Sequence, residues 1–260
     1  MTLFLGIDVG TYQSKGVLVD ETGEVVAEAA RRHRLLAPRP GWAEHDPEAD
    51  WWGDVAALSR ELSDTAGAPE EIAAVAVSAI GPCVVGIGPD GRATTSGILY
   101  GVDTRASVEV SELLDRIGLD AVLARSGNGL DSQSGGPKIL WLQRHEPEGA
   151  AAAVCFGTAT TFIVNRLTGE RVMDRYTAAN YGPLWDADAQ DWIHDLAPEI
   201  NAQGRLPRLA WTSEIVGQIT PQAAAETGLA SGTPVTAGGI DAAAEAVSVG
   251  VRKPGDLMLM

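Results

Sequence analysis

The chain has 260 residues, of which 45% are hydrophobic and 21% are charged, and this composition is typical of a folded globular protein rather than a disordered one. Its formal net charge of -16 means that the surface repels nucleic-acid phosphates and anionic lipids, so we expect neither nucleic acid nor membrane as a partner. Any anionic ligand would need backbone N–H groups, a helix end or a metal ion to provide a local positive field.

Cysteine usage and the start of the chain indicate a cytoplasmic protein. Cys83 and Cys155 lie far apart and have no spacing typical of a zinc site, and a structural disulfide is not expected in a reducing cytosol. Residues 1–8 contain no basic segment and reach Asp8 at once, so they do not predict a signal peptide. The sequence has no apolar run of the length that a membrane span needs.

Three short strands are predicted at the start of the chain, over residues 3–9, 16–19 and 25–29. Each is apolar, and turn-forming residues separate them, so we expect an antiparallel meander.

Helices and strands then alternate along the chain. Helices are predicted over residues 51–66, 105–117, 139–145, 158–167 (capped by Thr158) and 241–249, and strands over 72–80, 84–87, 97–100, 154–156 and 234–237. Residues 170–180 stay unassigned, residues 185–208 read as irregular with helical pieces, and residues 258–260 begin another apolar run. This order predicts an α/β fold with a mixed sheet flanked by helices.

The first chemical motif is the segment Gly6–Thr11 (GIDVGT), followed by Lys15. Gly10 at the end of a strand lets backbone N–H groups approach phosphate oxygens, and Asp8 could hold Mg²⁺ through water. The alternative is an ordinary strand–turn–strand, but the position on the first strand, directly before a hairpin, favours the functional interpretation.

The second motif, residues 236–241 (TAGGID), is a strand, two glycines and an acid at the start of a helix. This pattern puts Asp241 at the carboxyl edge of a sheet, where open α/β sheets form ligand crevices. The alternative, equally compatible with the sequence, is that Asp241 only caps the following Ala-rich helix.

Together with several further segments, these motifs resemble the FGGY carbohydrate kinase family, especially its xylulokinase-like branch. The matching segments, in the order expected for the family, are 38–52 (PRPGWAEHDPEADWW), 99–105 (LYGVDTR), 137–148 (PKILWLQRHEPE), 167–170 (LTGE) and 238–241 (GGID). The resemblance implies a ribonuclease-H-like sheet of the actin-like ATPase type, forming one lobe of a normally two-lobed kinase.

The resemblance also implies roles for individual residues. Asp241 would be the catalytic base that accepts the proton of a sugar hydroxyl, and Asp8 would orient Mg²⁺. The β- and γ-phosphates of ATP would face Gly10, Thr11 and Lys15, and the cofactor-binding set would also include Gly238 and Gly239. Lys138 matches the family pattern, although at a helix start its stem could simply cover apolar surface.

One segment departs from the family. Where xylulokinases typically have Ser-Gly-Gln-Met-His-Gly, this chain has residues 78–83 (SAIGPC), so Ile80, Gly81 and Pro82 occupy the expected sugar-binding loop. Losing such polar groups changes specificity, and Asp103 with Arg105 could replace them as ligands for vicinal hydroxyls. The alternative for this pair is a surface ion pair at a helix start.

We therefore expect a sugar-binding domain over residues 1–245, followed at residues 246–260 by the start of a connection to a nucleotide-binding domain. The expected activity is ATP- and Mg²⁺-dependent phosphorylation of a ketopentose or related polyol, with little activity in this chain alone. A non-catalytic sugar-binding or regulatory module is the alternative, and an actin-type scaffold is less well supported by the sequence. Surface that a second lobe would cover should be exposed near Gly10, Gly238 and Met258, so homodimerisation or aggregation is expected.

Overall fold

The computed structural model describes residues 2–253 and 255–258. Its first three strands are β1 (Leu3–Val9), β2 (Gln13–Asp20) and β3 (Val25–Arg32), each antiparallel to the next. Alternate residues of β1, namely Leu5, Ile7 and Val9, are buried in the core. The predicted meander is therefore confirmed, with longer second and third strands than the apolar runs indicated.

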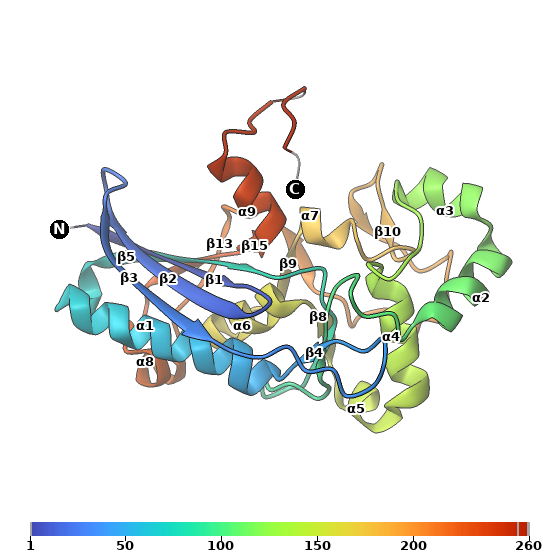
Figure 1. The fold of residues 1–260 in the computed structure, drawn as a ribbon, viewed down its shortest axis with the longest axis horizontal. Coiled ribbons are helices and arrows are strands. Elements are labelled where there is room, and N and C mark those ends of the chain that lie inside the picture. Colours follow the sequence, from blue (N-terminus) through green and yellow to red (C-terminus); the bar gives the residue numbers. More distant parts are fainter. Residues whose placement is uncertain (1, 254, 259–260) are drawn as a thin grey trace.

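A mixed sheet grows from this meander. Its strand order is β13-β14-β5-β1-β2-β3, and β15 also pairs with β5. The added strands are β5 (Ile72–Ala79), β13 (Ile215–Gln218), β14 (Pro234–Thr236) and β15 (Gly239–Ile240). Because β1, β14 and β15 all run parallel to β5, their carboxyl ends point toward the same edge of the sheet (Figure 1).

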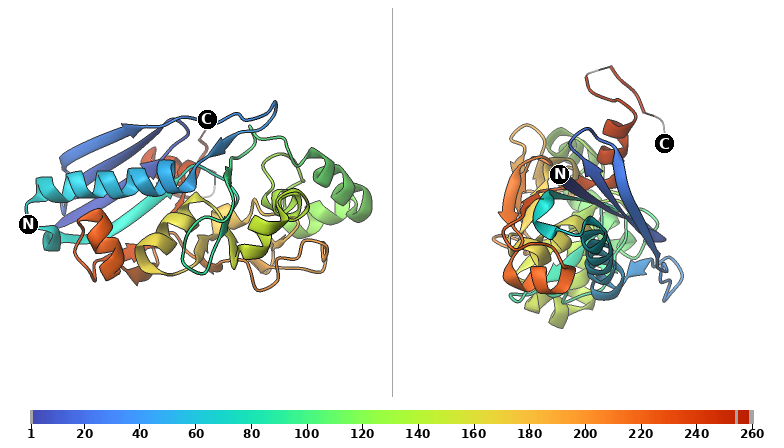
Figure 2. Two further views of the ribbon diagram at one scale, coloured as in Figure 1. Left: turned by 90° about the horizontal axis from the view of Figure 1, so that it is seen from below. Right: turned by 90° about the vertical axis from the view of Figure 1, so that its left-hand side faces the viewer.

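Helices cover both faces of the sheet. The helix α1 (Gly53–Ala66) packs on β2 and β3, and Figure 2 shows α8 (Pro221–Thr227) beside it. The helix α6 (Ala159–Thr168) packs on β5 from the same side, while α9 (Asp241–Ser248) lies on the opposite face (Figure 1). A Cβ on Gly16 of β2 would lie 2.7 Å from Leu62 Cδ1, so glycine there permits the close approach of α1.

A second group of helices extends the molecule away from the sheet and encloses its own apolar core. These helices are α2 (Ser107–Ile117), α3 (Leu119–Ser126), α4 (Gly135–His145) and α5 (Pro147–Ala152). The remaining elements are short: β4 (Glu44–His45), η1 (Pro47–Trp52), η2 (Pro69–Glu71), β6 (Val85–Ile87), β7 (Gly97–Ile98), β8 (Cys155–Gly157), β9 (Val172–Asp174), α7 (Arg175–Ala178), β10 (Trp185–Asp186), β11 (Asp191–Trp192) and β12 (Arg208–Ala210).

The structure corrects two local predictions. Residues 185–208, all within the described chain, contain the strands β10 and β11 and no helix. Thr158 is the N-cap residue of α6, but its hydroxyl accepts a hydrogen bond from the Cys83 amide at 3.3 Å instead of capping the helix. The unassigned segment 170–180 forms β9 and α7, and residues 259–260 of the final apolar run lie outside the described residues.

Cys83 and Cys155 are both free thiols and both buried. Burial raises the pKa of each thiol to about 12, so neither is an ionised nucleophile at neutral pH. Within the described residues, no helix combines the length and the apolar character that crossing a bilayer requires.

The exposed apolar surface lies partly where the sequence placed it. Gly238 itself is buried, whereas Gly10 and Met258 are half-buried. The most exposed large apolar side chains toward the carboxyl end are Val247 at 65%, Val249 at 67% and Leu257 at 88%. Part of the exposed apolar surface is therefore on α9 and the described residues that follow it.

Candidate functional site

Three neighbouring parallel strands bring the two sequence motifs together. Ser78 on β5 is in register with Asp8 on β1 on one side and with Gly239 on β15 on the other. Asp241 follows two residues after Gly239, at the point where β15 ends and α9 begins. The fold therefore places both acidic motifs at the carboxyl edge of one sheet, where α/β proteins usually bind their ligands.

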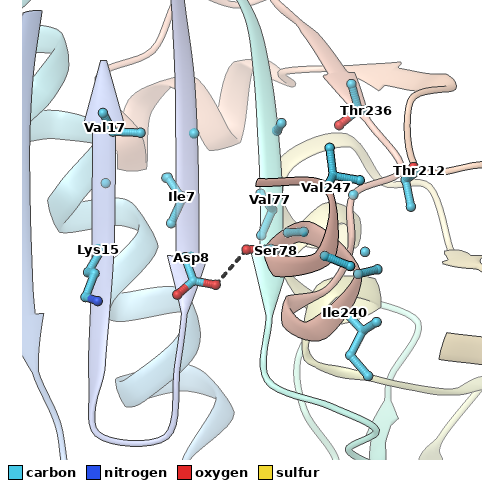
Figure 3. A pocket seen from close by; sticks show the side chains of 18 of the residues that line it. Ile7, Asp8, Lys15, Val17, Val77, Ser78, Thr212, Thr236, Ile240 and Val247 are labelled. Atoms are coloured by element: carbon cyan, nitrogen blue, oxygen red, sulfur yellow. Dashed lines mark hydrogen bonds between the residues drawn. The ribbon is translucent and has the colours of Figure 1, made fainter. Parts of the chain in front are cut away.

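The Asp8 carboxylate is oriented by a neighbour on the next strand. The Ser78 hydroxyl donates a 2.6 Å hydrogen bond to Asp8 Oδ1. Lys15 on β2 lies in register with Asp8 from the other side, and Figure 3 shows the three side chains near the same edge of the sheet. This leaves a fixed carboxylate beside a positive charge, an arrangement suited to a metal ion and phosphate groups.

These side chains face a cleft of about 1230 Å³. The cleft is lined by residues of β1, β2, β3, β5 and β15 together with α9 and Thr212 (Figure 3). Its lining includes Asp8, Lys15, Ser78, Gly238, Gly239, Ile240, Ala243 and Val247. Asp241 is not itself a lining residue, but it follows the lining residue Ile240 in the chain, so the cleft borders both motifs.

Asp241 has the electrostatics of a proton acceptor. Burial raises its pKa to about 6, and the negative charge of Asp8 contributes in the same direction. Among the described residues, its side chain accepts a hydrogen bond only from the adjacent amide of Ala242, at 2.8 Å. A carboxyl group with a pKa near neutrality can take up a proton and release it again, as a general base must.

The helix-cap alternative for Asp241 fits the structure less well. The N-cap position of α9 is occupied by Ile240, and Asp241 is the first helical residue. The side chain of this N-cap residue makes no capping hydrogen bond, and the Asp241 carboxylate accepts from the first-turn amide of Ala242. The Asp241 carboxylate is therefore available for a role beyond that of starting the helix.

A Cβ at each glycine of the two motifs would meet a different neighbour. Gly238 has a φ of +68°, and a Cβ there would collide with the carbonyl oxygen of Val77. A Cβ on Gly239 would come within 2.9 Å of Thr212. A Cβ on Gly10 would come within 3.0 Å of the Gln13 carbonyl, across the turn. All three positions thus need glycine for backbone packing, whatever they bind.

The loop that departs from the family pattern is largely closed. Ile80 is 1% exposed within the apolar core, Pro82 is also buried, and Gly81 is half-buried. A Cβ on Gly81 would come within 3.1 Å of the Ile240 side chain. The loop therefore borders the residue before Asp241, but the Ile80 and Pro82 side chains are turned into the protein.

Asp103 and Arg105 form a buried pair, not a surface one. The Arg105 guanidinium donates to Asp103 Oδ2 at 2.7 Å and to Glu44 at 2.6 Å, and it lies 4.0 Å from the ring centroid of Trp42. Asp103 also accepts a 2.6 Å hydrogen bond from the Ala43 amide. The pair joins the segment 42–44 to the segment 103–105, which gives it a structural role.

Lys138 is similarly committed to the fold. The residue is 1% exposed, and its ammonium group donates to the carbonyls of Leu99 and Tyr100, the second at 2.9 Å. Burial lowers its pKa to about 8. Tyr100 in turn places its hydroxyl 3.2 Å from Thr11 Oγ1, so Lys138 indirectly supports the turn that carries Thr11.

The sequence did not predict the hydrogen bond from Ser78 to Asp8 or the side chains that contact the turn after β1. The signal for Ser78 was a single polar residue inside the apolar run 72–80. His33 and His45 gave no such signal, although their side chains contact the turn at 3.0 Å.

Comparisons with known proteins agree with this geometry. Residues 3–248 match the sequence model of the amino-terminal domain of the FGGY family of carbohydrate kinases. The chain is 32% identical to a xylulose kinase of Escherichia coli over 99% of its length and 52% of that protein. It is 30% identical to a glycerol kinase of Nocardia farcinica over 82% of its length and 44% of that protein.

Among solved structures, xylulose kinase from Rhodospirillum rubrum matches with a TM-score of 0.90 and 35% identity, over 98% of this chain and 52% of that one. The chain thus spans about half the length of the relatives it matches. Its mixed sheet flanked by helices is the amino-terminal lobe of a kinase of the actin-like ATPase type. The chain belongs to the FGGY family of carbohydrate kinases, as its amino-terminal domain.

Proposed function

We propose that this chain supplies the sugar pocket, the catalytic base and the first phosphate loop of an ATP-dependent carbohydrate kinase. The observation that carries the proposal is the placement of Asp8 and Asp241 at the carboxyl ends of neighbouring parallel strands beside one cleft. The substrate is a ketopentose or related polyol, in line with relatives named xylulose kinase and glycerol kinase.

Asp241 acts as the general base. It accepts the proton of the sugar hydroxyl while that oxygen attacks the γ-phosphorus, and the oxygen bridging the β- and γ-phosphates leaves with its electron pair. Phosphoryl transfer needs mainly positioning and charge neutralisation, so one base at the strand edge is sufficient protein chemistry for the acceptor side. The raised pKa of about 6 supports this role, since it lies close to physiological pH.

Asp8 holds the Mg²⁺ that accompanies the nucleotide. Mg²⁺ is usually bound in kinases through one or two carboxylates, several waters and the substrate phosphates, and Asp8 with its Ser78 hydrogen bond fits that donor set. When bound, the ion would neutralise charge on the β- and γ-phosphates. Lys15, which lies on the other side of Asp8 from Ser78, adds a second positive charge. The turn at Gly10 and Thr11 faces the phosphates.

The adenosine is bound mainly by a second domain, which closes over the cleft. We propose that residues 1–245 form the sugar-binding domain and residues 246–260 begin the connection, although α9 runs through this boundary to Ser248. The exposed apolar side chains Val247 and Val249 support a partner surface at this position. We assign neither Asp103 nor Arg105 to the sugar, because the fold already uses their hydrogen-bonding groups.

The test is the variant Asp241→Asn, in the kinase that combines this chain with a nucleotide-binding half. The amide is nearly the same shape but cannot accept the hydroxyl proton, so turnover should fall by about 10²–10⁴-fold while sugar affinity is kept. Thermal stability should be unchanged or slightly higher above about pH 6, because the native state no longer carries a disfavoured charge. The matched control is Asp64→Asn on the exposed face of α1.

Each outcome separates the candidate functions. Lost turnover with intact sugar binding and stability supports the base. Retained turnover in Asp241→Asn would remove Asp241 from the mechanism. Sugar binding with no turnover even in the unmodified protein would instead favour the non-catalytic sugar-binding module.

A further inference from the structure

Two histidines hold the backbone of the turn between β1 and β2. The carbonyl oxygens of three consecutive turn residues, Gly10, Thr11 and Tyr12, all accept hydrogen bonds from one of these histidines. His33 donates through Nε2 to Gly10 at 3.0 Å and through its backbone amide to Tyr12 at 3.1 Å. His45 Nε2 lies 3.0 Å from the Thr11 carbonyl oxygen.

The proton positions on His45 follow from its partners. The Trp51 indole N–H donates to His45 Nδ1 at 3.0 Å, so Nδ1 must be the unprotonated nitrogen. The proton then sits on Nε2, which donates to the carbonyl of Thr11. His45 is completely buried, and this burial, together with the charge of His33, lowers its pKa to about 4. It is therefore a neutral donor with a fixed tautomer.

His33 differs, because both of its ring nitrogens face acceptors. Nδ1 lies 2.8 Å from a carboxylate oxygen of Asp54, and Nε2 lies 3.0 Å from the Gly10 carbonyl. A carboxylate and a carbonyl can only accept, so both nitrogens carry protons and the ring is a cation. The side chain is 3% exposed, so this charge is held inside the protein directly behind the turn.

The contacts of His33 and His45 with the carbonyls of Gly10–Tyr12, called the clamp below, leave amide groups of the turn free. With the three carbonyls directed toward the histidines, none of the hydrogen bonds between described residues uses the amide N–H of Thr11 or Tyr12. Successive unpaired N–H groups in a turn form a concave site for an anion, and a nearby positive charge strengthens it. The Thr11 side chain is fixed separately by the Tyr100 hydroxyl at 3.2 Å.

We propose that His33 and His45 are positioning residues for phosphate binding, which fix the Gly10–Tyr12 turn through its carbonyls and place a buried imidazolium behind it. This inference rests on the proposed function for the identity of the anion, a nucleotide phosphate. The histidines do not contact the phosphate. They set the direction of the amide groups that do.

The proposal predicts a pH dependence on the alkaline side. Burial lowers the pKa of His33, but the Asp54 hydrogen bond, the Gly10 carbonyl and the charges of Asp54 and Asp50 outweigh it and raise the pKa above 6.5. The other groups that face the ring are the neutral His45, with ring centroids 4.8 Å apart, and the Ser14 hydroxyl. The clamp therefore carries its full positive charge below about pH 6.5 and loses this charge as the pH rises through the His33 pKa, while the hydrogen bonds from His45 and from the His33 backbone amide remain.

The first experiment needs neither variants nor kinase activity. Side-chain nitrogen NMR of the 260-residue chain should show His33 as an imidazolium at about pH 6 and His45 as the Nε2-protonated tautomer. The amide signals of Gly10, Thr11 and Tyr12 should shift with the His33 titration, and added tripolyphosphate should move the last two more strongly below the His33 pKa. A neutral His33 at about pH 6, or turn amides that ignore its titration, would overturn the clamp.

The second experiment measures the effect of the clamp on turnover in the kinase that contains this chain. His33→Gln removes the charge but keeps a donor, so the KM for MgATP should rise about tenfold, with the KM for sugar unchanged. Its alkaline pH dependence should disappear. Asp54→Asn should act in the same direction, and His45→Gln, which can still donate to Thr11, should be milder than His45→Leu. His145→Gln, at a half-exposed position on α4, is the control.

The two proposals fail in distinguishable ways. An unmodified kinase without turnover contradicts the proposed function, and the NMR experiment then still decides the clamp. A working kinase whose His33→Gln variant keeps its KM for MgATP and its pH profile contradicts the clamp alone. Equal effects of His45→Gln and His45→Leu, without any change in KM for MgATP, would indicate a purely structural role and also overturn it.

Discussion

Turnover by the proposed kinase should fall steeply below about pH 6, because the Asp241 base then becomes protonated. With a pKa of about 6, roughly 90% of Asp241 is ionised near pH 7 and roughly 10% near pH 5. The value of kcat/KM for the sugar should therefore drop about tenfold between these two pH values. An aspartate at the ordinary pKa of 3.8 would lose less than about a tenth of its ionised form over the same range.

The assay is the initial rate at subsaturating sugar and saturating MgATP, measured from about pH 5 to pH 8 in buffers of constant ionic strength. Saturating nucleotide keeps changes in MgATP affinity out of the result. A divalent ion bound beside Asp8 would offset only the smaller contribution of the Asp8 charge to the raised pKa of Asp241, because burial, the largest cause, remains. A flat profile across this range, with the protein still folded at the acid end, would refute the assignment of Asp241 as the titrating base.

Three further outcomes are expected. The 260-residue chain alone should turn over far below the ~1–100 per second typical of kinases, and normal rates would show that no second domain is needed. Exposed Val247, Val249 and Leu257 should cause association in solution, which light scattering at rising concentration would detect. Gly238→Ala should cost about 3 kcal/mol or more of unfolding free energy, because it adds a backbone collision to an unfavourable φ, whereas Gly232→Ala, with open space around it, should cost about 1 kcal/mol by denaturant titration.

Local pattern was sufficient for the part of the fold that carries the acids. The meander at residues 3–32 and the buried strand near 72–80 are both found, because short turns and uninterrupted apolar runs leave few alternatives. Residues 185–208 were harder, because two-residue strands such as β10 and β11 are formed by tertiary pairing and have no periodicity of their own.

The site shows the same division between local and long-range information. Asp8 lies near the end of β1 and Asp241 directly follows β15, and both strand ends are visible in the sequence, so their convergence could be predicted from topology. The burial and hydrogen bonding of Asp103 and Arg105 could not be predicted, because they depend on the Ala43 amide and on Glu44, some 60 residues away in the chain. Spacing alone cannot show that a carboxylate's hydrogen-bonding capacity is already used by the protein.

The two titrating groups around the cleft should leave separate signatures in one data set. Asp241 must lose its proton to act on the sugar hydroxyl, so its titration belongs to the acid limb of kcat/KM for sugar. His33 must keep its proton to hold the phosphate turn, so its titration belongs to the alkaline limb of KM for MgATP. Asp241→Asn should therefore lower turnover and leave the nucleotide limb in any residual activity, while His33→Gln should remove the nucleotide limb and leave the acid limb in place. A single variant that abolished both limbs would mean that the two sets of groups titrate as one coupled system, and the separation of a base from a phosphate clamp would be wrong.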